Sequence, residues 1–532
     1  MKSLREAINV LFSKHESWQV VCYTITATIF FYLILRSNPR RDARRIFTKT
    51  RRWFFYSIRR LPYIGKKIQD EIDKACKELQ NSLFNSKTDL TYLQKLPHAG
   101  MKHDEIFTLI DNYELIGQVN WKKGNVSGTV YNYDKELTKL ITKVYERFLW
   151  SNPLHSDVFP GVVKMEAEVI RMCLGLFHGS STSCGSVTSG GTESILMACL
   201  SYRNKGYKLG ISHPEIVAPV TAHAAFNKAC EYFGLKLISV PVDTNFQADL
   251  TAMRRAITSN TVLLVASAPQ YPHGIIDDVK SIAQIAVSRG IGFHVDCCLG
   301  GFLLPFLNEA GYDDVQFDFA VEGVTSISAD THKYGFAPKG SSVVLYRHIE
   351  QRHLQYFSVS DWPGGIYASP SIAGSRSGAV IAGCWAAMVS MGWSGYVKST
   401  KKIIKAAQRI KDRIKEVDGL YVLGDPKLSV IAIGSKDFDI YQLNQLMSDK
   451  GWNLNALQFP PSIHICCTMT HTQPGVVTKF LRDIKEVAAQ LIQEPRKTPI
   501  GSAAMYGMAQ TIPDRSIITD LTNAFLDGIY KT

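Results

Sequence analysis

The chain has 532 residues, of which 45% are hydrophobic and 20% are charged, and this composition excludes a disordered or low-complexity protein. Its net charge of +13 would suit nucleic-acid binding, but 12 Lys and Arg with a single acid, Asp42, fall within residues 36–67. That segment carries +11 and leaves +2 on the other 500 residues. The basicity is therefore local, and no nucleic-acid partner is expected.

Residues 18–35 form an 18-residue run without a charge, which is long enough for a slightly short transmembrane helix. Trp18 suits the membrane interface, and the basic segment that follows is hard to place in a protein core. A buried soluble helix is the weaker alternative, and a cleaved signal peptide lacks its small-residue site. Because basic residues mark the cytosolic end of a span, we expect residues 1–17 to be luminal and 36–99 to be a cytosolic basic linker and helix. The basic cluster would also favour anionic lipid headgroups.

Eleven cysteines are scattered along the chain, and none forms a C-x-x-C pair. An odd number without a spacing pattern indicates free thiols in a reducing compartment rather than a disulfide framework. The adjacent pairs Cys297–Cys298 and Cys466–Cys467 are too cramped for ordinary disulfides. We therefore expect a cytosolic body with buried thiols and no bound metal.

Residues 100–375 alternate apolar strand-like runs with helical periods such as 278–290, and this alternation predicts an α/β domain with a largely parallel sheet. Ligands of such sheets bind at the carboxyl ends of the strands. The expected strands are 215–220, 236–242, 261–268, 292–296, 326–330 and 341–346.

The pattern changes at residue 376, and residues 376–495 predict a smaller α+β domain. Residues 496–532 form a less regular tail, but the apolar stretch 505–508 predicts that the tail docks back near the active site. The smaller domain is expected to contain helices over 378–393, 396–417, 439–450 and 474–492 and strands over 420–424, 429–434 and 463–468.

The stretch TSGGTES (188–194) precedes a helical run. Glycines allow the backbone to approach an anion closely, and a helix N-terminus supplies free N–H groups and the positive end of a dipole. A phosphate would fit there, with Gly191 and Thr192 as its contacts. Taken alone, an ordinary capped helix after a turn explains the stretch better.

Two further strand ends carry a histidine and an acid. His223 follows the strand 215–220, where its ring can lie flat against an aromatic cofactor, although a core or surface histidine explains this residue better when it is taken alone. Asp296 ends the strand 292–296, where a carboxylate is costly unless it is paired. It would suit a cationic pyridinium, or else the N-cap of a helix over 300–310.

Lys333 follows His332 after the next strand, 326–330. A lysine that bonds to a cofactor aldehyde must lie within reach of the ring that Asp296 anchors, and a neighbouring strand end provides that position. His332 is placed to contact the phosphate of the cofactor. A solvated lysine would explain Lys333 alone, but the four elements in this order predict a pyridoxal 5′-phosphate (PLP) site.

The order SGGTES, AHAAFNKA, HVDCCLGG and SADTHKYGFAPKG resembles the group II PLP-dependent decarboxylases of fold type I. One departure is Cys297, where these enzymes more often have alanine; both side chains are small, so little effect is expected. The resemblance covers nearly the whole chain and is greatest to the sphingosine-1-phosphate lyases, through NPLHSDVFPGVVKMEAE (152–168), ASAPQYPHGIIDDV (266–279), DWPGGIYASPSIAGSR (361–376), WNLNALQFPPSIH (452–464) and YGMAQT (506–511).

The resemblance implies a retro-aldol cleavage of sphingosine 1-phosphate, between Cα and Cβ, to a long-chain aldehyde and phosphoethanolamine. In that reaction Lys333 is the catalytic lysine, Asp296 keeps the pyridine nitrogen protonated and His223 lies against the ring. The base for the C3 hydroxyl stays open between Lys333, His155, a tyrosine and the cofactor phosphate. The family also implies an endoplasmic-reticulum membrane location and a homodimer in which Ser369 reaches the partner's cofactor.

The phosphate of such a substrate requires cations and hydroxyl groups. Lys339, six residues after Lys333, is the first candidate, with a solvated turn lysine as the alternative. Similarity to the lyase motifs adds a weaker set of substrate-binding candidates: Asn152, His155, Tyr367 and Tyr506.

Two rival functions remain. A PLP-dependent amino-acid decarboxylase would use the same cofactor residues, but it needs an arginine for the substrate carboxylate, for which Arg376 is the candidate, and it has no need of a membrane anchor. A catalytically inactive membrane scaffold would have no reason to keep the complete set of lysine, histidine and aspartate.

Overall fold

The computed structural model describes residues 92–117, 119–494 and 515–530, together with positions 16, 24, 66, 70, 73 and 74. The predicted transmembrane helix 18–35, apart from Thr24, lies outside the described residues, as does most of the basic linker. The chain divides into two compact units, one formed by Met1–Ile116 with Gly507–Thr532 and the other by Gly117–Tyr506. In the first unit the structure describes α5 (His103–Glu114) and α18 (Arg515–Ile529).

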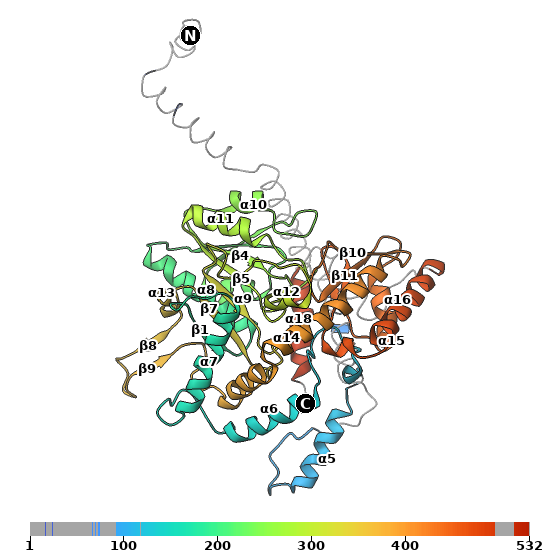
Figure 1. Ribbon diagram of the computed structural model, residues 1–532, viewed down its shortest axis with the longest axis horizontal. Coiled ribbons are helices and arrows are strands. Elements are labelled where there is room, and N and C mark those ends of the chain that lie inside the picture. Colours follow the sequence, from blue (N-terminus) through green and yellow to red (C-terminus); the bar gives the residue numbers. More distant parts are fainter. Residues whose placement is uncertain are drawn as a thin grey trace. The chain divides into compact units, whose positions relative to one another are not determined.

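The second unit is built on a seven-stranded sheet with the order β1-β7-β6-β5-β4-β2-β3 (Figure 1). Strands β3, β2, β4, β5 and β6 run parallel, whereas β7 is antiparallel to both β6 and β1. The mainly parallel sheet confirms the α/β prediction. The strands are β1 (Cys184–Thr188), β2 (Glu215–Pro219), β3 (Lys236–Val240), β4 (Thr261–Ser267), β5 (Gly292–Asp296), β6 (Ser326–Ala329) and β7 (Ser342–Tyr346).

Helices cover both faces of this sheet, because successive residues of its strands point to opposite sides. Leu264 of β4 and Val343 of β7 pack in one hydrophobic cluster, whereas the next residues, Val265 and Val344, pack in a second one. The second cluster includes α8 (Gly191–Lys208) and α9 (Ala225–Phe233). The first includes α7 (Pro160–Leu176), α10 (Leu250–Ala256) and α11 (Val279–Arg289).

A second, four-stranded antiparallel sheet has the order β10-β11-β13-β12 and belongs to the same compact unit. A smaller α+β domain was expected over 376–495, and the structure places this sheet in the same compact unit as the larger sheet. Its elements are β10 (Leu420–Val422), β11 (Val430–Ser435), α15 (Ile440–Asp449), β12 (Asn455–Leu457), β13 (Ser462–Cys466) and α16 (Val476–Gln493).

The long helix α14 (Gly378–Ile414) joins the two sheets. Two helices were expected here, over 378–393 and 396–417, and the structure breaks the run at Gly392, whose φ of 55° lies in the left-handed region that glycine tolerates. Among the described residues α14 is the one helix long and apolar enough to cross a membrane. It packs against α6 (Lys135–Phe148) and α7, so we assign it as a core helix.

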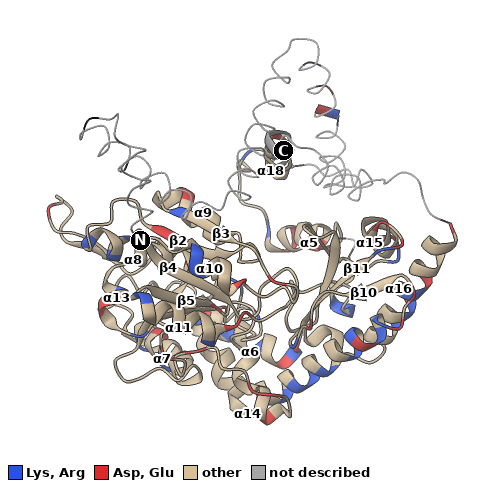
Figure 2. Ribbon diagram, turned by 90° about the horizontal axis from the view of Figure 1, so that it is seen from above, with Lys and Arg blue, Asp and Glu red and all other residues tan. Residues whose placement is uncertain are grey.

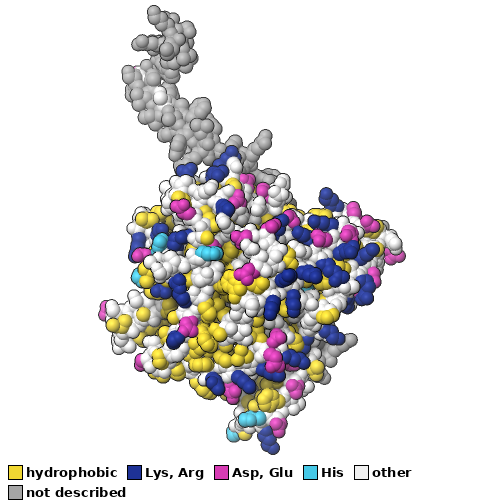
Figure 3. Space-filling model, viewed as in Figure 1, with side chains coloured by type: hydrophobic (Ala, Val, Ile, Leu, Met, Phe, Trp, Pro, Cys, Tyr) yellow, Lys and Arg dark blue, Asp and Glu magenta, His cyan; other side chains and the backbone are white. Residues whose placement is uncertain are grey.

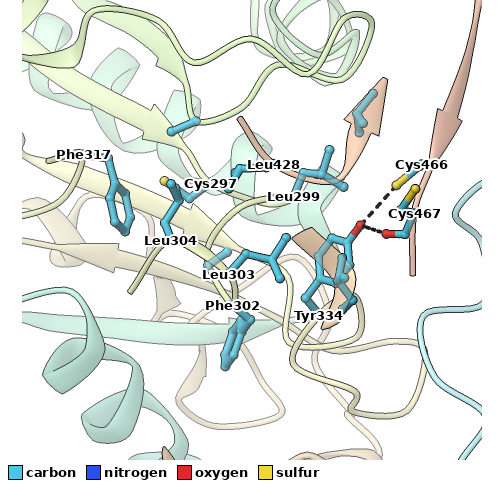
Figure 4. Close-up of a cluster of buried hydrophobic side chains, with 14 of the residues drawn as sticks. Cys297, Leu299, Phe302, Leu303, Leu304, Phe317, Tyr334, Leu428, Cys466 and Cys467 are labelled. Carbon is cyan, nitrogen blue, oxygen red and sulfur yellow. Dashed lines mark hydrogen bonds between the residues drawn. The ribbon is translucent and has the colours of Figure 1, made fainter. Parts of the chain in front are cut away.

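Nine described cysteines are all free and buried, as the absence of a spacing pattern predicted. Cys297 belongs to an apolar cluster with Leu299 and Phe317 (Figure 4).

Short elements complete the second unit. They are η1 (Trp121–Lys123), η2 (Leu304–Phe306), α12 (Leu307–Ala310), α13 (Ile349–His353), β8 (Phe357–Val359), β9 (Tyr367–Ser369) and η3 (Met469–Thr472).

Candidate active site

A cavity of about 340 Å³ lies where α8 begins and where the chain leaves β2 and β6. Its position agrees with the rule that ligands of parallel sheets bind at the carboxyl ends of the strands. Five of the residues predicted from the sequence line this one cavity, although up to 142 positions separate them in the chain: Gly191, Thr192, His223, His332 and Lys333.

Lys333 forms an ion pair with Asp330, at 2.8 Å between Nζ and Oδ2. The side chain of Asp330 is only 3% exposed, and Nε2 of His332 lies 3.7 Å from the same oxygen. Burial by itself would raise the pKa of Asp330, but the positive charges of Lys333 and His332 lower it. Burial would likewise lower the pKa of Lys333, whereas the carboxylate of Asp330 raises it. The two groups therefore hold each other in their charged forms.

The N-terminus of α8 faces the cavity without a side-chain cap, so its first N–H groups are available to an anion. Gly191 is required there, because a Cβ at this position would lie 2.8 Å from both Oδ1 of Asp330 and Sγ of Cys298. Glu193 fixes the preceding turn by accepting a hydrogen bond from the backbone N–H of Ser189 at 2.7 Å. His223 is held in place because its Nδ1 accepts the N–H of Ala225 at 3.1 Å, at the start of α9.

Asp296 lies next to the wall of the cavity that Cys298 forms. Its Oδ1 accepts hydrogen bonds from the backbone N–H of Cys298 at 3.0 Å and from the hydroxyl of Ser328 at 3.2 Å. Ser328 reaches it because β5 and β6 pair in the register that sets Asp296 opposite Ser328. His294, two residues earlier in β5, contacts the same hydroxyl at 3.1 Å.

Lys339 turns back toward the site. Its Nζ lies 4.8 Å from the ring centre of Tyr131, and it donates a long hydrogen bond of 3.5 Å to the carbonyl of His332. Burial and the neighbouring Cys466 raise the pKa of Tyr131, and the positive charge of Lys333 acts in the opposite direction. Tyr334 fixes the segment after Lys333, because its hydroxyl donates to the carbonyl of Cys467 at 2.6 Å (Figure 4).

Within the described chain, neither Lys339 nor the other substrate-binding candidates line this cavity. Asn152 organises a loop instead, because its side chain donates to Ser375 and accepts the N–H of Arg376. Ser369 is buried and donates to the carbonyls of Ser371 and Ala373. His155 is exposed and Tyr367 lies beside Trp362, whereas Tyr506 lies outside the described residues.

Four residues of the site were not singled out in the sequence: Asp330, Ser328, His294 and Tyr131. Asp330 stands three residues before Lys333, a spacing that could have suggested an ion pair. Ser328 and His294 act across two paired strands, so only the register of the sheet reveals them. No local pattern marks Tyr131.

Residues 140–434 match the family model described as the pyridoxal-dependent decarboxylase conserved domain. The chain is 48% identical to sphingosine-1-phosphate lyase 1 of Rattus norvegicus, over 99% of this chain and 92% of the relative. It is 46% identical to the sphingosine-1-phosphate lyase of Drosophila melanogaster, over 100% of this chain and 98% of the relative.

Solved structures give the same result. A sphingosine-1-phosphate lyase from Burkholderia pseudomallei superimposes with a TM-score of 0.74 at 39% identity, covering 76% of this chain and 94% of that one. A glutamate decarboxylase from Lactobacillus brevis has a TM-score of 0.67 at 20% identity, over 77% of this chain and 97% of that one, and this likeness concerns the fold alone.

The residues of the cavity fit the PLP cofactor of this family. The uncapped start of α8, which glycine keeps open, suits the phosphate group, and Nδ1 of His332 is buried without a partner. The amine of Lys333 lies in the cavity, and Asp296 beside its wall has a carboxylate whose Oδ1 is already fixed. Among the described residues no cluster of three His, Cys, Asp or Glu side chains could hold a metal ion. The family model, the full-length relatives and the fitted cavity agree, and the chain belongs to the sphingosine-1-phosphate lyases within the pyridoxal-dependent decarboxylase family.

Proposed function

We propose that this protein is a PLP-dependent aldehyde-lyase that cleaves sphingosine 1-phosphate and related phosphorylated sphingoid bases in sphingolipid degradation. The products are a long-chain aldehyde and phosphoethanolamine. One observation carries this proposal: the lysine-containing cavity occurs in a chain that matches curated lyases over almost its entire length.

When bound, PLP accepts the electron pair of the Cα–Cβ bond that breaks. The residues of this chain perform the remaining tasks. Gly191, Thr192 and His332 would hold the cofactor phosphate, and His223 would lie against the ring. Asp296 would keep the proton on the pyridine nitrogen, and Lys333 would hold the cofactor through its amine.

Arg376 favours the lyase over the decarboxylase. Both terminal nitrogens of its guanidinium bind the carboxylate of Glu166, and each side chain is 16% exposed. An arginine that must bind a substrate carboxylate cannot also be neutralised in this way. In the described chain Arg376 is therefore already occupied, and it does not line the cavity of Lys333.

The membrane and dimer parts of the proposal rest on other features. The uncharged run 18–35 and the basic segment 36–67 support a single span in the endoplasmic reticulum, with residues 1–17 luminal and the catalytic body cytosolic. A homodimer is supported by apolar side chains gathered over α7 and the start of α14 (Figure 3). The hairpin β8–β9 and its flank also expose apolar residues, namely Phe357, Trp362, Ile366 and Ile372.

Incubation of the purified full-length protein with PLP and sphingosine 1-phosphate is expected to release aldehyde and phosphoethanolamine in equal amounts. Mass spectrometry of both products checks this result. Carbon dioxide released from an amino acid, without aldehyde from the lipid, would establish the decarboxylase instead. Protein that binds no PLP and turns over neither substrate would support the scaffold.

A further inference from the structure

The second half of α14 carries five cations on one side: Lys398, Lys401, Lys402, Lys405 and Arg409, here called the α14 basic face. All five are exposed, and their spacing of three and four residues places them in one row along about 16 Å of helix. The opposite side of the same segment is buried, through residues such as Ile403, Ala407 and Ile410. Figure 2 shows basic residues following one another along this helix.

No ion pair among the described residues involves the α14 basic face, and residues 396–411 contain no acid. Other cations close by are neutralised: Lys479 and Arg482 of α16 pair with Asp483, and Lys411 of α14 itself pairs with Asp425. Within the row, like charges stand three or four residues apart, which destabilises a helix. A surface of opposite charge would relieve this repulsion.

We propose that the α14 basic face docks on the anionic headgroups of the membrane in which the substrate lies. A row of exposed lysines on a straight helix can contact a flat surface with all its members, and anionic lipids attract such clusters. The inference rests on the proposed function only in that the substrate is a membrane lipid.

Lysine footprinting tests this contact without any reference to turnover. The full-length protein with PLP is reconstituted into nanodiscs of phosphatidylcholine, with or without phosphatidylserine, and treated with an acetylating reagent. Mass spectrometry is expected to show acetylation of Lys401, Lys402 and Lys405 slowed about threefold or more by phosphatidylserine, and high salt should remove the effect. Exposed lysines elsewhere, Lys135, Lys143, Lys208 and Lys280, serve as controls and should keep their rates.

Substitution of Lys398, Lys401, Lys402 and Lys405 by glutamine should raise KM for substrate presented in anionic nanodiscs and leave kcat in detergent unchanged. The matched variant with Lys135, Lys143, Lys208 and Lys280 replaced by glutamine should behave like the wild type. Equal acetylation in both kinds of nanodisc would overturn the inference, as would protection that appears only when RNA or an acidic protein is added. If phosphatidylserine protects these lysines but the wild-type protein does not cleave the lipid, the proposed function is contradicted and the inference about the α14 basic face stands.

A buried chain of hydrogen bonds beneath the cavity carries a second, independent inference. The hydroxyl of Tyr202 on α8 donates to Ser326 at 2.9 Å, and Ser326 lies 2.8 Å from Nδ1 of His294. At the other end, Ser328 donates to Asp296 and lies 3.1 Å from Nε2 of His294. Tyr202, His294, Ser326 and Ser328 are completely buried.

The Asp296 end of this chain fixes the proton on His294. Ser328 gives its proton to Asp296, so it accepts from Nε2–H of His294, which leaves Nδ1 as an acceptor for the hydroxyl of Ser326. Burial lowers the pKa of His294 to about 4, which agrees with a neutral ring at physiological pH.

We infer that His294, Ser326 and Ser328 are positioning residues, which turn one hydroxyl donor toward Oδ1 of Asp296 and fix the orientation of its carboxylate for the cofactor nitrogen. Ser328→Ala should therefore weaken PLP binding about tenfold, since it removes a hydrogen bond to a charged acceptor. Ser328→Thr should restore most of the affinity. Ser201→Ala, which deletes an equally buried hydroxyl bonded to Gln351, should leave PLP affinity unchanged.

PLP affinity is measured from the visible absorbance of the bound cofactor during titration, and selective ¹⁵N labelling of histidine reports the tautomer. His294→Gln assigns the signal of His294, which should be the neutral Nε2–H form. A wild-type affinity in Ser328→Ala or an Nδ1–H tautomer of His294 would contradict the inference. Both readouts are made without turnover, so they do not depend on the identity of the substrate.

Discussion

Replacement of Lys333 by arginine or alanine is expected to lower the rate of lipid cleavage by at least about 10³-fold, because neither side chain offers an amine that can bond the cofactor. The two variants differ in what they do to Asp330. Arginine keeps a positive charge beside this buried carboxylate, whereas alanine leaves it unpaired. Lys333→Arg should therefore fold like the wild type, and its loss of activity reports the chemistry alone.

Product release is measured by mass spectrometry, and the bond to the cofactor by visible absorbance after borohydride treatment. Both variants should still bind PLP reversibly, because the start of α8, His223, His332 and Asp296 remain. Lys280→Arg serves as a control for an exposed lysine away from the cavity, and it should keep the activity of the wild type. Turnover of Lys333→Arg within tenfold of the wild type would refute the role of Lys333.

The sheet could be predicted because its central strands are buried on both faces and therefore appear as uninterrupted apolar runs. The six strands expected from the sequence end within two residues of those observed. β1 escaped notice because its sequence, CGSVT, is short and partly polar. It becomes a buried strand only through its antiparallel pairing with β7, which no local pattern encodes.

The cofactor residues could be predicted for a similar reason, since each follows a recognisable strand or begins a helix. Asp330 and Ser328 were missed because their roles depend on contacts formed after the strands pair. Asn152, Tyr367 and Ser369 came from motif similarity, and within one chain they lie away from the cavity of Lys333. Motif similarity does not state where a side chain lies in the folded chain, so it did not reveal this separation.

Asp330→Asn is expected to destabilise the cofactor-free protein by about 3 kcal/mol, at the lower end of the range for breaking a buried ion pair. The lower end applies because the side chain of Lys333 is 22% exposed and can turn toward water. The Asp330→Asn substitution keeps the shape of the side chain, so packing is preserved. Urea denaturation of the wild type and the variant gives the difference.

The pH dependence of this difference identifies its cause. The pKa of Asp330 is lowered in the folded state, so its contribution is complete above the unfolded value of about 4 and is lost as the pH falls through the folded value. The pKa of Lys333 is raised, so its contribution is complete below about 10.4 and is lost at higher pH. The cost of Asp330→Asn should accordingly be constant near neutrality and shrink in acid.

A double-mutant cycle separates the ion pair from other effects of the substitution. Lys333→Met should be destabilising alone, because it leaves the carboxylate of Asp330 buried and unpaired, but Asp330→Asn with Lys333→Met should recover most of the stability. In Asp330→Asn alone the pKa of Lys333 falls, so more of the amine is neutral at pH 7 and covalent uptake of PLP should become faster. Additive losses in the cycle, together with unchanged uptake, would mean that Asp330 does not hold Lys333 as a protonated amine before the cofactor arrives.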